Sequence, residues 1–147
     1  MRKTFLGVLS LATAPCFFAA ALAAEPVPPK VGACAWPAAQ DAVQAAPENH
    51  RVIFENDKVR VLDVTLSPRT REPLHAHCSP SVLYITDAGK YVDYDADGKV
   101  LFDSRTMTTP PTLPMVIWKG PEAPHAVENL DDQPVHLIRV ELKPQTT

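Results

Sequence analysis

The stretch Pro73-Leu74-His75-Ala76-His77-Cys78 decides how the rest of the chain is interpreted. Its two histidines are two residues apart, and side chains with that spacing on a β-strand project from the same face. The strand rise places their Cα atoms about 6–7 Å apart, which is close enough for both imidazoles to hold one metal ion. A third histidine, His125, follows roughly fifty residues later. We expect the chain to fold back so that the three histidines meet.

The first 23 residues have the layout of a secretory signal peptide. Arg2 and Lys3 form a positive start, an apolar run follows, and Ala21-Leu22-Ala23 resembles a cleavage site. An uncleaved membrane anchor is disfavoured by Pro15 and by the small residues at the end of the run. A lipoprotein acylated at Cys16 is disfavoured because Pro15 stands at the peptide bond that would be cut. We therefore expect residues 1–23 to be removed and the protein to be periplasmic or secreted, with no membrane contact after cleavage.

Composition excludes some classes of partner. Removal of residues 1–23 reduces the 14 basic side chains to 12 against 17 acidic ones, which gives a formal net charge of −5. The remaining Lys and Arg residues form no cluster, so the sequence predicts no nucleic-acid partner. Cys34 and Cys78 are then the two cysteines left, and an oxidising compartment favours a disulfide between them over two free thiols.

Two regions follow the signal peptide. Residues 24–49 are rich in Pro and Ala and predict an irregular lead with one short helix at 38–46. Residues 50–143 predict a single all-β domain, a sandwich or small barrel, because short apolar runs alternate with turn residues. The expected strands are 51–54, 58–66, 72–77, 81–86, 91–95, 99–103, 115–118, 126–129 and 134–142. In 58–66 the apolar residues change face, which suggests a bulge or a strand shared by two sheets. The segment 106–114 predicts a loop across the barrel mouth, and 119–124 predicts a turn.

Taken together, H-x-H at His75–His77, Gly89 and H-x-x-x-N at His125–Asn129 resemble the two motifs of the cupins, small jelly rolls built as a double-stranded β-helix. The resemblance covers about residues 50–143 and extends to the opening run Glu55–Val61. It implies that His75, His77 and His125 bind a divalent metal. It is also compatible with a homodimer.

The sequence departs from the cupin pattern at important positions. The family glutamate that usually completes the metal site falls on Val82 or Ser81, and Arg69 replaces the leading glycine of the first motif. The resemblance therefore does not transfer a four-ligand site. On a strand, Glu128 would point away from His125, so it is a poor substitute.

Three neutral imidazoles remain as the predicted ligands. They suit Fe, Mn, Ni, Cu or Zn, leave the 2+ charge of the metal uncompensated, and favour a small anionic ligand. The alternative for His75 and His77 is a polar pair on a solvent-facing strand. His136 shares a face with Ile138 and is expected to point into the barrel, as a core histidine rather than a fourth ligand.

Few other groups are candidates for catalysis. The weak candidates for a general acid or base are Tyr84 and His136. The aromatic side chains that either line the cavity or belong to the core are Tyr84, Tyr91 and Trp118. His50 is expected on the surface. Three functions stay open at this point: a metal-dependent enzyme such as a dioxygenase, which the cupin resemblance allows, a non-catalytic module that binds a small ligand or metal, and a structural domain that dimerises.

Overall fold

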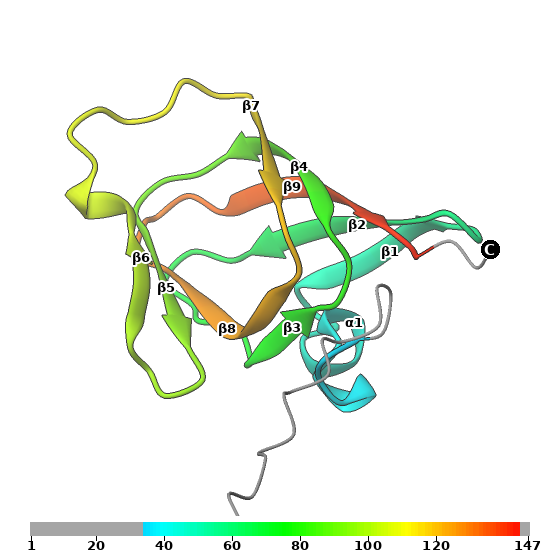
Figure 1. Cartoon of the computed structure of the whole chain (residues 1–147). Helices are drawn as coiled ribbons and strands as arrows, with labels where there is room; N and C mark the ends of the chain where they lie inside the picture. The colour runs from blue at the N-terminus through cyan, green and yellow to red at the C-terminus, as the bar shows by residue number, and fades with distance from the viewer. Residues whose placement is uncertain (1–33, 145–147) are drawn as a thin grey trace, which may run out of the picture.

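Alternating apolar and polar side chains after residue 49 produce the β structure of this chain. The computed structural model describes residues 34–144 (Figure 1). The expected signal peptide lies outside these residues. The described strands are β1 (His50–Glu55), β2 (Val59–Leu66), β3 (His75–His77), β4 (Ser81–Asp87), β5 (Tyr91–Asp95), β6 (Val100–Asp103), β7 (Met115–Lys119), β8 (Glu122–Asn129) and β9 (Val135–Leu142). The short helices are η1 (Ala38–Gln40), α1 (Ala42–Ala45) and η2 (Ser104–Thr106).

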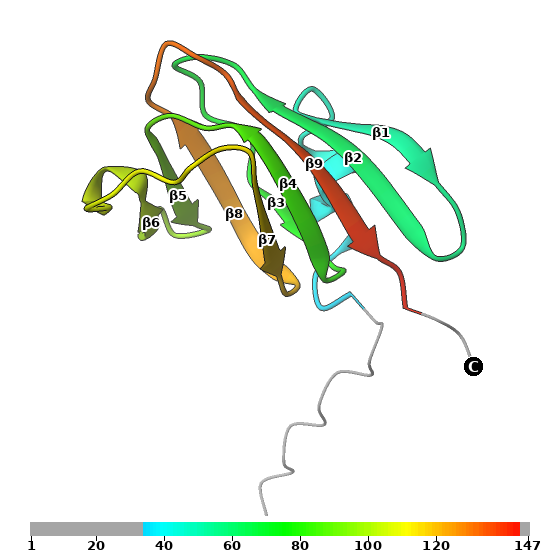
Figure 2. The same cartoon turned by 90° about the horizontal axis from the view of Figure 1, so that it is seen from above.

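The strands form two antiparallel sheets that face each other (Figure 2). One sheet has the order β1-β2-β9-β4-β7 and the other has the order β3-β8-β5-β6. Leu62, Val64 and Leu66 of the first sheet are buried on the side that faces the second sheet. This arrangement confirms the all-β barrel that the sequence predicted.

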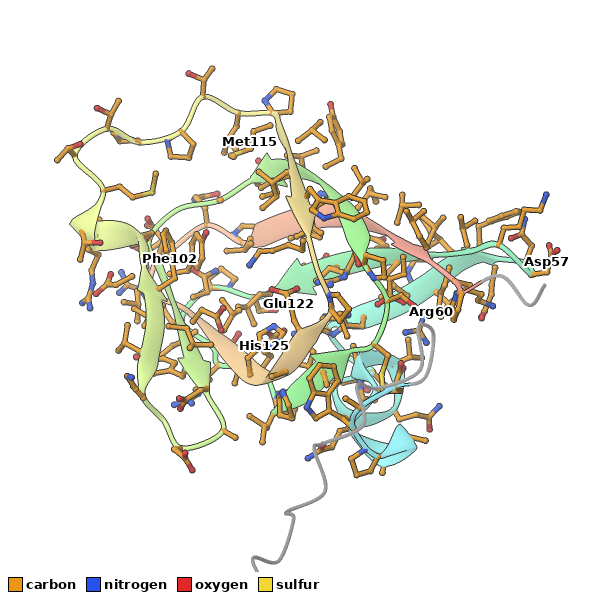
Figure 3. The ribbon with its side chains drawn as sticks, in the orientation of Figure 1. Asp57, Arg60, Phe102, Met115, Glu122 and His125 are labelled. Atoms are coloured by element: carbon orange, nitrogen blue, oxygen red, sulfur yellow. A yellow bond between two sulfur atoms is a disulfide. The ribbon has the colours of Figure 1, made fainter. Side chains whose placement is uncertain are left out.

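Two strands differ in length from the prediction. The expected strand at 72–77 is regular only in β3, the three residues from His75 to His77. The expected turn at 119–124 is shorter, because β8 already begins at Glu122. The extra residues of β8 carry Glu122 into the barrel, where Figure 3 shows it beside His125.

The expected change of face in 58–66 is absent. β2 pairs with β9 without interruption from Val59 to Leu66, and Leu62 and Leu66 are buried. The bulge lies instead in the neighbouring strand β1, between Val52 and Phe54. The prediction was wrong because the outer face of this sheet also carries apolar side chains, so regular alternation looked like a switch.

Arg69 occupies the position where the cupin pattern has glycine, and its φ angle is 58°. This left-handed conformation is uncommon for a residue with a Cβ atom. The guanidinium of Arg69 pairs with Asp132 at 2.9 Å in an exposed contact. The departure from the pattern therefore retains the backbone conformation for which the glycine is suited.

The N-terminal lead is attached to the barrel by a backbone bridge and by a disulfide. The expected helix at 38–46 forms as two short pieces, η1 and α1, with Asp41 between them and capping α1. Asp41 also forms a parallel bridge with Ala76 of β3. The expected disulfide between Cys34 and Cys78 is present, with the two Cα atoms 4.9 Å apart. Among residues 34–144, no helix is long and apolar enough to cross a membrane.

Candidate metal centre

The pairing of β3 with β8 brings the three predicted histidines together inside the barrel. His75 pairs with His125 across the two strands, and His77 pairs with Glu122. The ring of His75 lies 5.0 Å from that of His77 and 4.6 Å from that of His125, measured between centroids. All three rings are buried.

A fourth histidine, His50, joins this cluster, so its expected surface position was wrong. It is 3% exposed and its ring centroid lies 4.4 Å from that of His75 and 5.3 Å from that of His77. His50 begins β1, and both β1 and β3 contact α1. The isolated position of His50 along the chain did not indicate this convergence.

The four rings share one hydrogen-bonding pattern, in which Nδ1 faces an acceptor. Nδ1 of His75 lies 2.9 Å from the carbonyl of Pro73, and Nδ1 of His125 lies 2.9 Å from that of Ala123. His50 faces the carbonyl of Ala46 in the same way at 3.2 Å. Because a carbonyl only accepts, Nδ1 carries the proton in these three rings. Their Nε2 lone pairs are therefore free to bind a metal.

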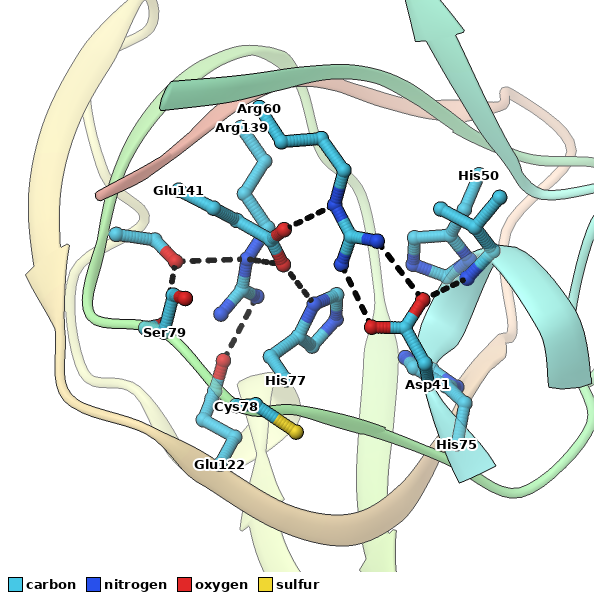
Figure 4. A network of polar contacts seen from close by, with 12 residues as sticks. Asp41, His50, Arg60, His75, His77, Cys78, Ser79, Glu122, Arg139 and Glu141 are labelled. Atoms are coloured by element: carbon cyan, nitrogen blue, oxygen red, sulfur yellow. Dashed lines mark hydrogen bonds and ion pairs between the residues drawn. The ribbon is translucent and has the colours of Figure 1, made fainter. Parts of the chain in front are cut away.

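The fourth ring, His77, is oriented by a carboxylate. Its Nδ1 donates to Oε1 of Glu141 at 2.8 Å, and both side chains are almost completely buried. The Nε–H of Arg60 donates to the other oxygen of Glu141 at 2.6 Å. The Nη1 and Nη2 groups of Arg60 form a bidentate ion pair with the carboxylate of Asp41 (Figure 4). Metal-binding histidines are commonly held by such a carboxylate. The chain of contacts links this histidine to the N-terminal lead.

The ligand atoms fall into two overlapping groups. His50, His75 and His77 present nitrogen atoms within 4.8 Å of one another, and Glu72, His75 and His125 present a second set within the same distance. His75 belongs to both groups. The donor set, mainly imidazole nitrogen, fits a divalent transition metal.

Burial keeps His50, His75 and His77 neutral at physiological pH. It lowers the pKa of His50 to about 4 and that of His75 to about 3, and it lowers the pKa of His77 well below its usual value. The positive charge of Arg139 also lowers these pKa values. Neutral imidazole is the form that binds metal. Glu72 responds in the opposite sense, because burial raises its pKa to about 8.

Arg139 of β9 lies beside the cluster, and no motif in the sequence pointed to it. It is 4% exposed, donates from Nη1 to Glu122 at 2.8 Å, and donates from Nε to Ser81 at 3.0 Å. Burial would raise the pKa of Glu122, but Arg139 and Lys119 outweigh it and lower that pKa to about 2. Both oxygens of Glu122 are therefore committed to cations, which leaves it unsuited to a metal.

Neither residue at the position of the family glutamate supplies a carboxylate to the histidines. Ser81 faces inward and is completely buried, where it accepts from Arg139. Val82 follows it on the strand and therefore faces outward, so no carboxylate at that position could reach the histidines.

A cavity of about 120 Å³ lies against the four histidines. Apart from polar groups near the histidines and at its mouth, its walls are apolar and include Val64, Leu66, Leu83, Val127, Val135 and Leu137. Tyr91, Asp93, Ile117 and Lys119 line both this cavity and an outer groove of about 720 Å³. Met107 and two prolines of the 106–114 loop line the groove, in agreement with the loop expected at the barrel mouth.

The two weak catalytic candidates do not face this cavity. Tyr84 is 44% exposed on the outer face of the sheet, as is Trp118 at 60%. His136 also lies on the outer face, where its Nε2 contacts Asp63 at 2.8 Å and its Nδ1 contacts Thr86 at 2.6 Å. The inward position expected for His136 was wrong because the other face of β9 carries the buried polar residues.

Known structures agree with this architecture, although no protein-family model and no curated protein matches the sequence. A cupin domain from Bordetella pertussis is similar with a TM-score of 0.52 and 19% identity, over 65% of this chain and 92% of that one. An RmlC-like cupin from Methanocaldococcus jannaschii, described as a double-stranded β-helix, gives 0.47 and 12%, over 64% and 78%. A cupin superfamily protein from Desulfitobacterium hafniense gives 0.44 and 13%, over 65% and 76%. Together with the two antiparallel sheets, the first likeness shows that this chain has the cupin fold.

Proposed function

We propose that this chain binds one divalent transition metal through His75, His77 and His125, with His50 as a fourth ligand. The observation that carries the proposal is the shared Nδ1–H pattern, which points the basic nitrogen of each ring away from its backbone or carboxylate partner. Such outer hydrogen bonds fix the tautomer of metal-binding histidines.

The charges around the cluster support an anionic ligand. Three cations near the cluster, Arg60, Lys119 and Arg139, are matched by Asp41, Glu122 and Glu141, and Asp93, whose pKa is raised by burial, also lines the cavity. Glu72 is protonated at pH 7 because its pKa is about 8. A bound divalent metal would therefore keep most of its charge, and a small anion would offset it.

The shape of the cavity narrows the ligand further. Its apolar walls suit a hydrocarbon or aromatic body, and the outer groove gives such a body a route to the histidines. We propose that a carboxylate or similar anion with an apolar body enters past the 106–114 loop. A bound metal would supply Lewis-acid or oxygen chemistry, while the chain's own residues hold the ligand and exclude water.

The alternative is a cupin that binds a small ligand or metal without catalysis. The two are separated by screening small carboxylic acids and thiols for oxygen uptake with the metal-loaded protein, under air and under nitrogen. Uptake that disappears in His77→Ala supports an oxygenase. Ligand binding without turnover supports the binding module, and uptake that persists in the variant excludes this site as its source.

Export is part of the proposal. The signal-like sequence at residues 1–23 and the disulfide between Cys34 and Cys78 both fit an oxidising compartment, so we propose a periplasmic or secreted protein. Fractionation of the native cells, with detection of a chain that begins near residue 24, tests this placement. A full-length chain in the cytoplasm would contradict it.

The ligand set is tested with Cu²⁺ as a spectroscopic probe. We expect the electron paramagnetic resonance spectrum of the loaded full chain to show coupling to four nitrogen atoms, and His50→Gln to show three. His136→Gln is the matched control, because this histidine lies outside the barrel. An unchanged spectrum in His50→Gln with a loss in Glu72→Gln would assign the fourth position to the carboxylate. Absence of specific Cu²⁺ binding in the parent chain would refute the metal site itself.

A further inference from the structure

Two buried side-chain atoms in residues 34–144 have no hydrogen-bond partner: Oδ1 of Asp93 and Nη2 of Arg139. Both side chains line the inner cavity of about 120 Å³ beside the histidines. Buried polar groups in folded proteins almost always have a partner, because an unpaired group gives up its hydration without compensation. A donor and an acceptor that are left unpaired in one cavity therefore indicate a ligand that pairs with both.

Arg139 supplies a donor in a fixed position. It is 4% exposed, and its Nε and Nη1 groups donate to Ser81 at 3.0 Å and to Glu122 at 2.8 Å (Figure 4). These two contacts hold the plane of the guanidinium, so the direction of Nη2 is fixed as well. A guanidinium is always charged in proteins, and its geometry matches that of a carboxylate. Arg139 is therefore suited to the anionic end of a ligand.

Asp93 supplies an acceptor where the cavity meets the outer groove. It lines both spaces, whereas Arg139 lines only the inner cavity. A nearby cation, Lys119, is already paired with Glu122 at 2.8 Å. Burial outweighs the attraction of Lys119 and raises the pKa of Asp93. The Asp93 carboxyl group is therefore available to a ligand that passes from the groove to the histidines.

We propose that Asp93 and Arg139 select a hydroxycarboxylate as the ligand of this site. Arg139 donates to the carboxylate in the inner cavity. Asp93 accepts from a hydroxyl group that lies between the carboxylate and the apolar body of the ligand. This inference rests on the proposed anion-binding metal centre, and it adds the hydroxyl group and the two residues that recognise the ligand.

A hydroxyl group fits beside Asp93 better than an ammonium group does. A hydroxyl donates to a carboxylate and accepts from a carboxylic acid, so it pairs with Asp93 in either protonation state. An ammonium group would add a positive charge near Lys119, Arg139 and a divalent metal. The apolar body of the ligand then extends into the outer groove, where Phe102 and Met107 provide apolar contacts.

The first test measures what the hydroxyl group contributes to binding. Mandelate and phenylacetate share a carboxylate and a phenyl body and differ in one hydroxyl group, and isothermal titration calorimetry gives the affinity of the Zn²⁺-loaded full chain for each. We expect one enantiomer of mandelate to bind about tenfold more tightly than phenylacetate, because a hydrogen bond to a charged group contributes at least that factor. Equal affinities would overturn the inference and leave the proposed anion binding in place. No binding of either compound would overturn both.

The second test asks whether Asp93 holds that hydroxyl group. Asp93→Ala should bind the two compounds with similar affinity. Asp87→Ala is the matched control and should keep the preference for mandelate, because Asp87 is exposed and lines neither the cavity nor the groove. A preference that persists in Asp93→Ala would mean that the metal or another side chain holds the hydroxyl group, which would overturn the inference.

Stability separates this role of Asp93 from a structural one. The variant Asp93→Ala removes a buried oxygen that has no partner, so the metal-free variant should resist urea at least as well as the parent. A clear loss of stability would assign Asp93 to the support of the fold and would contradict the inference.

Arg139 is tested by a substitution and by a structure. Arg139→Lys keeps the charge but lacks the second arm, so both compounds should bind about tenfold more weakly while the preference for mandelate remains. A crystal structure of the parent with Zn²⁺ and mandelate needs no substitution, and it should place a carboxylate oxygen within hydrogen-bond distance of Nη2 and the hydroxyl group beside Oδ1 of Asp93. Unchanged affinities in a folded Arg139→Lys variant, or a carboxylate placed away from Nη2, would overturn the inference.

Discussion

Glu141 gives the sharpest prediction about how the metal centre is built. Its carboxylate accepts from Nδ1 of His77 at 2.8 Å and from Nε of Arg60 at 2.6 Å, and its side chain is about 2% exposed. Replacement by glutamine keeps the volume but removes the charge. One end of the amide can still accept, while its NH₂ end must face a second donor. The change therefore leaves one of the two neighbours without its acceptor.

The expected effects follow from that burial. Loss of one partner from a buried ion pair typically destabilises a protein by about 3–5 kcal/mol. Loss of the group that orients a metal-binding histidine typically weakens metal affinity by about 10–100-fold. We therefore expect Glu141→Gln to lose about 3 kcal/mol of unfolding free energy, and its metal dissociation constant to rise at least tenfold.

Two assays measure these effects separately. Urea denaturation of the metal-free protein gives the unfolding free energy, and competition with a chelator for Zn²⁺ gives the affinity. Glu128→Gln is the matched control, because Glu128 accepts from the Tyr94 hydroxyl on the other face of β8 and should change stability by no more than about 0.5 kcal/mol. A Glu141→Gln protein that matches the parent in both assays would refute the role given to this network.

Two further predictions concern pH and one glycine. The metal-free protein should lose stability as the pH falls below 6.5. The unfolded chain binds protons at His50 and His75 there, whereas the folded chain protonates His50 only near pH 4 and His75 only near pH 3. Each of the two histidines should lower the unfolding free energy by up to about 1.4 kcal/mol per pH unit. Glu72 acts in the opposite direction, because its raised pKa of about 8 makes stability fall as the pH rises from 4.5 to 8. The unfolding free energy measured by denaturation at pH 5, 6.5 and 8 should therefore be highest near pH 6.5. An unfolding free energy that does not change with pH would contradict this. Gly89→Ala places a Cβ atom 2.8 Å from Cβ of Asp131, so we expect a loss of about 1–3 kcal/mol that Asp131→Gly partly restores, whereas an unchanged melting temperature would show that the loop yields freely.

Much of the fold could be predicted from the sequence because strand alternation and turn residues are local signals. The pairing of His75 with His125 followed from two short motifs and a barrel topology. His50 could not be found in this way, since it stands alone in the sequence and reaches the cluster through the packing of β1 and α1. Its burial is a property of tertiary structure.

The inner and outer faces of β9 show why polarity alone misled. The segment 135–142 alternates apolar residues such as Ile138 and Val140 with Arg139 and Glu141, and the apolar set was assigned to the core. In the structure Arg139 and Glu141 face the barrel interior together with Val135 and Leu137, and their charges are satisfied by other buried or half-buried groups. Ile138 and Val140 face outward. Buried ion pairs depend on partners that are distant in sequence, so no local pattern identifies them.

The metal content of the protein purified from its native compartment tests the central claim most directly. Elemental analysis should find close to one equivalent of a divalent transition metal per chain, and this metal should be lost in His75→Ala or His125→Ala but kept in His136→Ala. Metal at background level, together with no change in melting temperature when divalent ions are added, would contradict a metal centre at these histidines.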